Sequence, residues 1–467
     1  MENVTNSLAH WLGRFGTGLL RLLPPETAHD IGIALLEKGC MEYLPAPKAP
    51  RVHTGLKVTV PGIGELAHPI GLGAGFDKQC RAPHGFSRMG FSFLEIGTVT
   101  PRPQPGSPKP RLFRYPEQKA LINRMGFNSD GATTVASRLK ALKWRHDEVP
   151  LGVNCGKNKS TPNDRAIQDY LQVMEAFRDL AGYFVVNISS PNTPGLRELA
   201  SPEFIDSLAA ELGSTLLPKT WVKLDPDTPR SDFQKVIERI CEGGFQGIIV
   251  SNTHRVVWPE VGGQSGHPLM APSTACLEWA HEVHQGRLPM IATGGILSGA
   301  DIFHKLARGA LAVQIYTALI YQGPWAVIRL LVELSEELKI RGLATARDAI
   351  GCYYRRKSLR RLIRWQPTWH LLLHGKETFF GTRNCKTHPR QCAWHSRRHS
   401  SRRSGDRSSY RPKTKADPAA SFSVLCVPRG HSLPLRALPR RHATCRRNLD
   451  QNARQPTPPR RQLRALP

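Results

Sequence analysis

Short apolar runs recur at regular intervals between residues 68 and 317, separated by segments with the spacing of amphipathic helices. Each run is almost continuously apolar or β-branched, which is typical of strands covered on both faces. Helical spacing is clearest over residues 165–180, 202–216, 232–241 and 299–307. The predicted strands are His68–Phe76, Phe93–Val99, Leu151–Gly156, Tyr183–Ser189, Trp221–Asp225, Gly247–Thr253, Met290–Ile296 and Ala312–Thr317.

Eight strands that alternate with helices predict an α/β fold, a (β/α)8 TIM barrel with a parallel sheet. An open doubly wound sheet is the alternative, but the first strand lacks a G-x-G-x-x-G motif that opens into a helix. Ser231 and Gln234 predict a capping box for helix 232–241, and Gly243-Gly244 predict its end.

The segment before the barrel predicts two short helices that are separated at Pro24-Pro25. The first combines large apolar residues with Arg14 and Arg21, as interfacial helices do, and a helical cap packed on the barrel fits equally well. No apolar run reaches the ~18 residues of a membrane-spanning helix. We therefore divide the chain into an N-terminal helical segment (1–45), a barrel (46–350) and a basic C-terminal tail (351–467).

Most of the net charge of +28 lies in the C-terminal tail, so the rest of the chain is close to neutral. From residue 353 onward there are 28 Lys and Arg against 4 Asp and Glu, and the apolar periodicity is lost. This composition predicts a disordered segment or an out-of-frame C-terminus. Basic charge raises the hypothesis of nucleic-acid binding, but the tail has few aromatic residues and no known module. The pairs Cys385/His388 and Cys392/His395 are too closely spaced for a zinc finger, so no metal is predicted.

Polar residues gather where the predicted strands end, and barrel enzymes carry their chemistry at that rim. A single asparagine there is more often a turn residue, so the joint occurrence of many polar positions is what favours a site. Amides suit an amide- or imide-bearing ligand, lysines suit a carboxylate or an electron-rich ring, and glycines after the last two strands suit a phosphate. We therefore predict a phosphate-bearing organic cofactor. The rim positions are Ala74-Gly75-Phe76-Asp77-Lys78, Thr98, Asn154, Asn187, Ser190, Asn192, Lys223, Ser251-Asn252-Thr253, Gly294-Gly295 and Tyr316-Thr317.

Several long motifs, in order, resemble those of the dihydroorotate dehydrogenases, and the resemblance spans about residues 5–345. Ser190 stands where the cytosolic classes have a cysteine base, and Leu23–His29 resembles the helix junction of the membrane-associated, quinone-dependent class 2. The chain is thus similar to class 2. The motifs are Ala74–Lys78, Glu95–Gln104, Asn123–Asn128, Asn187–Arg197 and Gly262–Gly266.

This resemblance implies a flavoenzyme that uses FMN to oxidise dihydroorotate to orotate, with ubiquinone or menaquinone as electron acceptor, in de novo pyrimidine (UMP) biosynthesis. It further implies a monomer held at the cytoplasmic side of the cell membrane, as a peripheral protein, by its N-terminal helices, with no nucleic-acid partner. Another FMN barrel oxidoreductase acting on dihydropyrimidines is the alternative. Those enzymes use a cysteine at the matching loop, and Ser190 argues against them.

By the same resemblance, Ser190 is the catalytic base, and Lys223 stabilises negative charge on the reduced flavin. Arg102 and Tyr316 are expected near the quinone path. Asp225, His254, Gln264 and the short connection 252–262 depart from the family pattern. The implied substrate-binding residues are Lys78, Asn123, Arg124, Met125, Gly126, Phe127, Asn187, Asn192, Asn252 and Thr253. The implied cofactor-binding residues are Ala74, Gly75, Phe76, Asp77, Lys78, Thr98, Asn154, Asn187, Lys223, Ser251, Gly266, Gly295, Tyr316 and Thr317.

Overall fold

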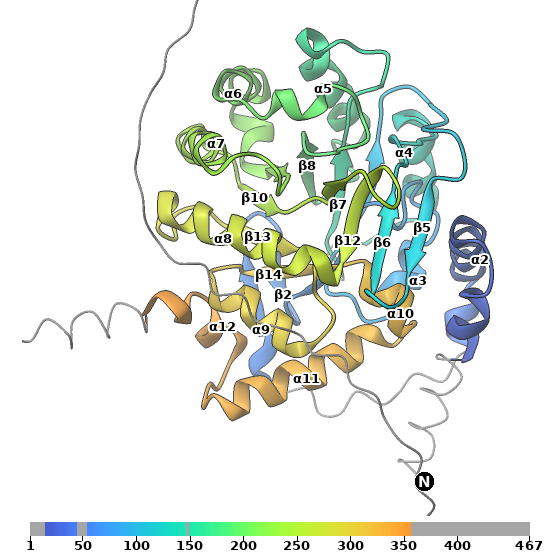
Figure 1. Ribbon diagram of the computed structural model, residues 1–467. Coiled ribbons are helices and arrows are strands. Elements are labelled where there is room, and N and C mark those ends of the chain that lie inside the picture. Colours follow the sequence, from blue (N-terminus) through green and yellow to red (C-terminus); the bar gives the residue numbers. More distant parts are fainter. Residues whose placement is uncertain (1–14, 44–53, 146–148, 356–467) are drawn as a thin grey trace, which may run out of the picture. The chain divides into compact units, whose positions relative to one another are not determined.

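A computed structural model describes residues 15–43, 54–145 and 149–355, and its centre is a closed barrel of eight parallel strands (Figure 1). Consecutive barrel strands are hydrogen-bonded neighbours, and the last pairs with the first. Each strand coincides with a predicted run, so the barrel is confirmed and the open-sheet alternative is wrong. The strands are β3 (Ile70–Leu72), β4 (Leu94–Val99), β7 (Leu151–Cys155), β8 (Tyr183–Asn187), β9 (Thr220–Leu224), β10 (Gly247–Val250), β13 (Met290–Thr293) and β14 (Ala312–Ile315).

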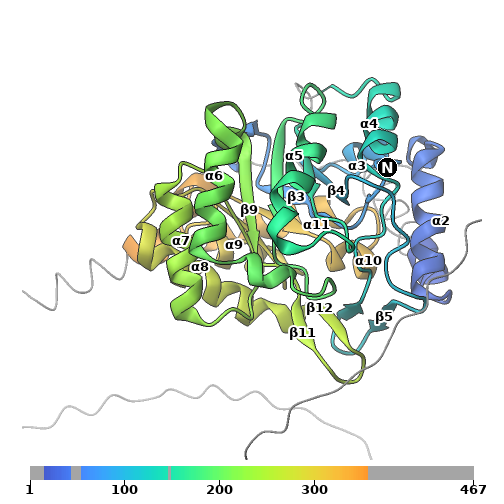
Figure 2. The same cartoon turned by 90° about the horizontal axis from the view of Figure 1, so that it is seen from above.

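Helices surround the barrel, as Figures 1 and 2 show. Two of them, over 202–216 and 299–307, have the predicted bounds. The helices are α3 (Pro83–Arg88), α4 (Ala132–Ala141), α5 (Ala166–Ala176), α6 (Pro202–Leu216), α7 (Arg230–Glu242), α8 (Met270–His284), α9 (Gly299–Ala307), α10 (Thr317–Gln322), α11 (Ala326–Ile340) and α12 (Ala346–Ala349). Short 3-10 turns lie at Cys40–Glu42, Thr54–Leu56, Asn163–Arg165, Leu196–Leu199, Leu217–Lys219 and His267–Leu269.

The predicted capping box of α7 is wrong, whereas the predicted end of this helix is confirmed. Pro229 is the N-cap and no side chain caps the helix, whose first residue is Arg230, so Ser231 already lies inside it. The helix ends at Glu242, and Gly244 then takes a left-handed conformation with φ of 79°. Genuine capping boxes occur at the starts of α9 and α12.

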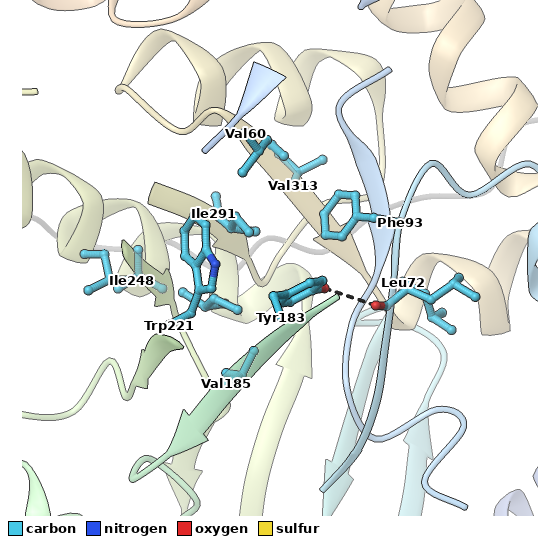
Figure 3. Close-up of a cluster of buried hydrophobic side chains, with 14 of the residues drawn as sticks. Val60, Leu72, Phe93, Tyr183, Val185, Trp221, Ile248, Ile291 and Val313 are labelled. Atoms are coloured by element: carbon cyan, nitrogen blue, oxygen red, sulfur yellow. Dashed lines mark hydrogen bonds between the residues drawn. The ribbon is translucent and has the colours of Figure 1, made fainter. Parts of the chain in front are cut away.

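Large aromatic rings close one end of the barrel interior (Figure 3). Phe93, Tyr183 and Trp221 are fully buried near the starts of β4, β8 and β9. Glycines on neighbouring strands make room for these rings: a Cβ on Gly152 would lie 2.2 Å from the Tyr183 ring, and one on Gly247 would lie 2.4 Å from Trp221. The hairpin of β1 (Val58–Val60) and β2 (Gly64–Leu66) leads into β3 at this same end. The interior is therefore a packed core.

A small antiparallel sheet, which the sequence did not predict, is built from the connections that follow β4 and β10. Its order is β11-β12-β6-β5, and β5 and the β11–β12 hairpin lie on the same face of the barrel (Figure 2). Because both connections leave the carboxyl ends of barrel strands, the sheet stands over the rim where we expect the site. Its strands are β5 (Leu112–Tyr115), β6 (Ala120–Asn123), β11 (His254–Val256) and β12 (Gly262–Gly266).

The N-terminal segment is helical over residues 15–20 and again in α2 (Pro25–Glu37), with Pro24 as the N-cap of α2. The predicted division at Pro24-Pro25 is thus confirmed, while residues 1–14, the predicted linker at 45–50 and the tail from 356 lie outside the described residues. α2 packs beside α3 and β5 (Figure 1). Every helix in the described part of the chain is too short or too polar to cross a bilayer.

Candidate active site

A pocket lies at the carboxyl ends of the barrel strands, between the barrel rim and the small antiparallel sheet. Most of the predicted site residues line it, although they come from segments almost 250 residues apart in the chain. The predicted residues that line the pocket are Ala74, Gly75, Lys78, Thr98, Asn123, Met125, Gly126, Phe127, Asn187, Ser190, Asn192, Lys223, Ser251, Asn252, Thr253, Gly266, Gly295, Tyr316 and Thr317.

Ser190 sits on the loop that follows β8, and its side chain is almost fully buried against the pocket. Among the described residues, the Ser190 hydroxyl makes one hydrogen bond, in which its oxygen accepts from the Asn192 backbone N–H at 3.3 Å. Arg197 anchors the same loop by donating to the Ser189 carbonyl at 3.2 Å and to the Thr253 carbonyl at 3.1 Å. The loop is therefore fixed at both sides of the serine while the hydroxyl stays available to a ligand.

Asparagines from several strands are joined by side-chain hydrogen bonds beneath and around the pocket. The Asn187 amide donates to Asn154 Oδ1 at 3.0 Å and to Thr98 Oγ1 at 3.1 Å. The Asn252 amide donates to Ser189 Oγ at 3.0 Å, and the Asn192 amide donates to Asn123 Oδ1 at 3.2 Å. Each amide is thereby held in one orientation, which fixes where the pocket presents donors and acceptors.

Lys223 of β9 faces a buried carboxylate that the sequence analysis did not single out. Its Nζ lies 3.5 Å from Oε1 of Glu95, whose side chain is fully buried in β4. Asn154 also donates to Glu95 Oε1 at 2.7 Å, and Gln314 of β14 donates to Oε2. A buried carboxylate requires such donors and a cation, so Glu95 and Lys223 form one unit under the pocket floor.

Lys78 stands where the main pocket meets a second, smaller one between α2 and the barrel. Its Nζ donates to the Gly75 carbonyl at 2.6 Å, and burial lowers the pKa of Lys78 to about 8. His29 of α2 lines the smaller pocket, and burial together with Lys78 and Arg81 lowers the pKa of His29 to about 3. This histidine is therefore neutral at physiological pH.

Arg111 pairs with the N-terminal segment, whereas Arg102, which we expect near the quinone path, bonds to a different loop. Arg102 turns towards Ser160 and Thr161, which its guanidinium reaches at 3.3 and 3.1 Å. Arg111 immediately precedes β5 and pairs with Glu26 in the first turn of α2 at 2.8 Å. Arg102 lines neither the main pocket nor the smaller one, and its place near a quinone path stays a prediction. The Tyr316 ring packs against Phe76, which lines the smaller pocket.

Glycines after β13 form a turn that admits no side chain. Gly294 and Gly295 have φ of 101° and 82°, and a Cβ on Gly295 would lie 2.3 Å from the Met270 Cα. Nearby, α10 begins at Thr317 without any side-chain cap, so its first backbone N–H groups are free of an intrahelical partner. Thr317 Oγ1 also bonds Ser265 Oγ at 3.0 Å. The turn and the helix start are suited to an anion.

Four predicted site residues do not line the main pocket. Phe76 packs against other rings, Asp77 accepts from the N–H groups of Arg81 and Ala82, and Asn154 lies in the network below. Arg124 instead pairs with Glu260 at 2.7 Å. Residues that line the pocket and escaped the sequence analysis include Leu112, Pro191, Ser265, Leu269, Thr293, Ile296 and Gln314.

The family departures lie beside the pocket rather than in its lining. Asp225 is buried and accepts backbone hydrogen bonds from Asp227 at 2.9 Å and Thr228 at 3.0 Å, so its charge is satisfied locally. His254 bonds Asp227, and the short connection forms the β11–β12 hairpin, in which His254 is opposite Gln264. These substitutions therefore leave the ligand-facing groups in place.

Comparisons with known proteins agree with this geometry. Residues 55–338 match the family model described as Dihydroorotate dehydrogenase. The dihydroorotate dehydrogenase (quinone) of Myxococcus xanthus is 42% identical over 354 residues, covering 72% of this chain and 97% of that protein. The mitochondrial enzyme of Mus musculus is 39% identical, covering 72% and 89%. The crystal structure of a DHODH from Eimeria tenella in complex with ferulenol has a TM-score of 0.65 at 36% identity, covering 71% and 96%. The chain therefore belongs to the dihydroorotate dehydrogenase family, in its quinone-dependent class.

Proposed function

We propose that this protein oxidises dihydroorotate to orotate in pyrimidine biosynthesis, with FMN as its resident cofactor and a quinone as the final electron acceptor. The observation that carries the proposal is the convergence of Ser190, two lysines and several asparagines on a single pocket. Neutral amides suit the carbonyl and N–H groups of a dihydropyrimidine ring, and the lysines suit its carboxylate and an electron-rich cofactor ring.

FMN fits the part of the pocket that the glycine turn and α10 form. Gly294 and Gly295 leave backbone open to a phosphate, and the start of α10 at Thr317 has uncapped N–H groups. Lys223 is the cation that would lie beside the flavin ring, with Thr98 and Asn187 as hydrogen-bonding neighbours. When bound, FMN supplies the ring that accepts two electrons and a hydrogen as hydride.

Ser190 supplies the group that removes the C5 proton of dihydroorotate. As the C5–H bond breaks, the hydroxyl accepts this proton and releases its own to water, while the C6 hydrogen leaves as hydride and the C5=C6 bond forms. A serine hydroxyl is a weak base. Among the described residues, the one hydrogen bond of the Ser190 hydroxyl is accepted from the Asn192 N–H. Precise placement of the substrate must therefore contribute much of the acceleration.

The substrate is held by Lys78 and the asparagines around it. Lys78 keeps a positive charge below its pKa of about 8, which suits the carboxylate of dihydroorotate. The Asn192 side chain donates a hydrogen bond to Asn123. The Asn252 side chain accepts one from the backbone N–H of Thr253, and both of these residues line the same pocket. These groups come from different connections, so they hold a small ring-shaped ligand from several sides.

We place the route of the quinone in the smaller pocket between α2 and the barrel. Glu26, His29 and Ile33 of α2 face Phe76 and Met125 there, and Lys78 and Met125 also belong to the main pocket. On the outer side, the helical segment carries exposed apolar residues, among them Leu22, which is 81% exposed. A peripheral contact with the membrane through these residues would bring a lipid-soluble quinone to the pocket mouth. We propose a monomer for this arrangement.

The proposal is tested with the purified full-length chain. It should be yellow, with a flavin spectrum that bleaches when dihydroorotate is added without oxygen and returns when a soluble quinone analogue follows. Ser190→Ala is the matched control, because it should keep the flavin and bleach at least ~10²-fold more slowly. A colourless protein that does not take up FMN, or a flavoprotein that dihydroorotate does not reduce, would contradict the proposal.

A further inference from the structure

Lys305 of α9 is a completely buried lysine that the proposed reaction does not use. Its Nζ donates to Ser273 Oγ at 2.6 Å, Thr274 Oγ1 at 2.8 Å and the Met270 carbonyl at 3.4 Å. Three acceptors match the three N–H bonds of an ammonium group. All three belong to the first turns of α8, so Lys305 ties α9 to the start of that helix.

No carboxylate forms an ion pair with Lys305 among residues 15–43, 54–145 and 149–355. Of the charged groups around it, Arg308 is a like charge and pairs with Glu278 at 2.6 Å. Asp301 is occupied by the N–H groups that start α9, and burial raises the pKa of the Cys276 thiol to about 12, so the thiol is neutral. Asp301 favours the positive form of Lys305 from a distance, but no side chain among the described residues forms a direct ion pair with Lys305.

The start of α8 adds further positive potential, because helix N-termini carry a partial positive charge. Burial lowers the pKa of Lys305 to about 7, so near neutral pH the free protein holds a mixture of ammonium and amine. A buried cation is otherwise strongly unfavourable without a partner. The burial of a lysine at this position therefore indicates that the protein binds an anion from solution nearby.

Ser273 connects Lys305 to the glycine turn of the pocket. The Ser273 hydroxyl that accepts from Lys305 lies 2.7 Å from the Leu269 carbonyl and 3.1 Å from the Gly294 carbonyl, and it can donate to either. Gly294 and Gly295 line the pocket, and Gly295 lies directly against Met270 of α8. When Ser273 donates to Gly294, two hydrogen bonds connect Lys305 to the backbone that the proposed function gives to the FMN phosphate.

We propose that Lys305 is the buried counter-charge of the anion bound at the Gly294-Gly295 turn, a positioning residue that holds this turn through Ser273 and takes up a proton when a phosphate binds. The inference rests on the proposed FMN site. The chemistry recognised is a phosphate monoester, and the proton that converts the Lys305 amine to ammonium comes from solvent.

The experiment compares two flavins that differ by the phosphate. Full-length protein freed of flavin is titrated with FMN and with riboflavin, following flavin fluorescence at pH 8. In Lys305→Met, FMN affinity should fall about tenfold or more, while riboflavin affinity changes less than about twofold, because only FMN brings the anion. Lys339→Met, an exposed lysine of α11, should change neither affinity.

Two further readouts separate this role from a purely structural one. Calorimetry of FMN binding at pH 8, in buffers of different ionisation enthalpy, should show proton uptake in the wild-type chain that Lys305→Met abolishes and riboflavin does not produce. Without flavin, Lys305→Met should unfold at the same or a higher temperature, because an uncompensated buried cation is gone. If Lys305→Met does not fold, Ser273→Ala should still weaken FMN more than riboflavin.

Equal loss of affinity for FMN and riboflavin, unchanged FMN affinity, or no proton uptake by the wild-type chain would each overturn the inference. A wild-type chain that binds neither flavin would overturn the proposed function first, and this inference with it. The two failures are thus distinguishable from the wild-type titration alone.

Discussion

Replacing Lys223 by methionine should destabilise the fold as well as disable the site, because Lys223 neutralises a buried carboxylate. Its Nζ lies 3.5 Å from Oε1 of Glu95, whose side chain is 0% exposed. At an effective dielectric constant of ~20, two unit charges at this distance attract by roughly 5 kcal/mol. Within the described part of the chain, removing Lys223 leaves Glu95 with the neutral donors Asn154 and Gln314 alone. We therefore expect a loss of about 3–5 kcal/mol in the free energy of unfolding.

The assay is urea unfolding of the full-length chain without flavin, so that cofactor binding does not contribute. Lys223→Met is compared with Glu95→Gln and with the double variant, in which both charges are gone. The double variant should recover at least ~2 kcal/mol relative to the sum of the single losses. Lys219→Met, an exposed lysine just before β9, should stay within about 0.5 kcal/mol of wild type.

A loss below ~1 kcal/mol in Lys223→Met, or strict additivity of the two single variants, would refute the reasoning. Either result would mean that the carboxylate of Glu95 is stabilised without Lys223. The lysine would then be available to the cofactor alone, rather than shared between the fold and the cofactor.

Other expectations concern single groups. Ser190→Ala should slow flavin reduction by dihydroorotate at least ~10²-fold in stopped-flow absorbance, yet cost only ~1 kcal/mol of stability; a near wild-type rate would exclude this base. Gly295→Ala should lose bound flavin, because its Cβ would lie 2.3 Å from the Met270 Cα, and flavin content after gel filtration checks this. Burial lowers the pKa of His68 to about 4, so the unfolded chain gains a proton first as pH falls below ~6.5, and stability should fall by about 3 kcal/mol between pH 7 and pH 4. Urea midpoints that do not depend on pH in this window would argue against it, and His68→Gln should flatten the dependence. Arg111→Leu removes the ion pair with Glu26 of α2, so it should lower quinone-dependent turnover without slowing flavin reduction. An equal loss of both rates would contradict a role of Arg111 in the quinone route.

The sequence alone determined the barrel and most of the rim. Parallel strands covered on both faces require continuous apolar runs, and these runs are local features of the chain. Since all barrel strands point the same way, the residue after each run falls on one rim, so Lys78, Asn187, Ser190, Lys223 and Asn252 could be grouped without a structure. Prolines and glycines likewise marked the break before α2 and the end of α7.

Only the tertiary structure decided which of the remaining polar residues matter, because their partners come from distant segments. Glu95 lies inside an apolar run and has no local signal, and its role depends on Lys223 of β9 and Gln314 of β14. Lys305 occupies a position that an amphipathic helix could expose, and its burial follows from how α8 packs on α9. The small sheet joins residues 112–123 to residues 254–266, and Arg111 at its edge pairs with Glu26 of α2, a contact that the sequence did not predict. Periodicity encodes which face of an element is buried, whereas the identity of the buried partner is fixed only when elements far apart in the chain come into contact.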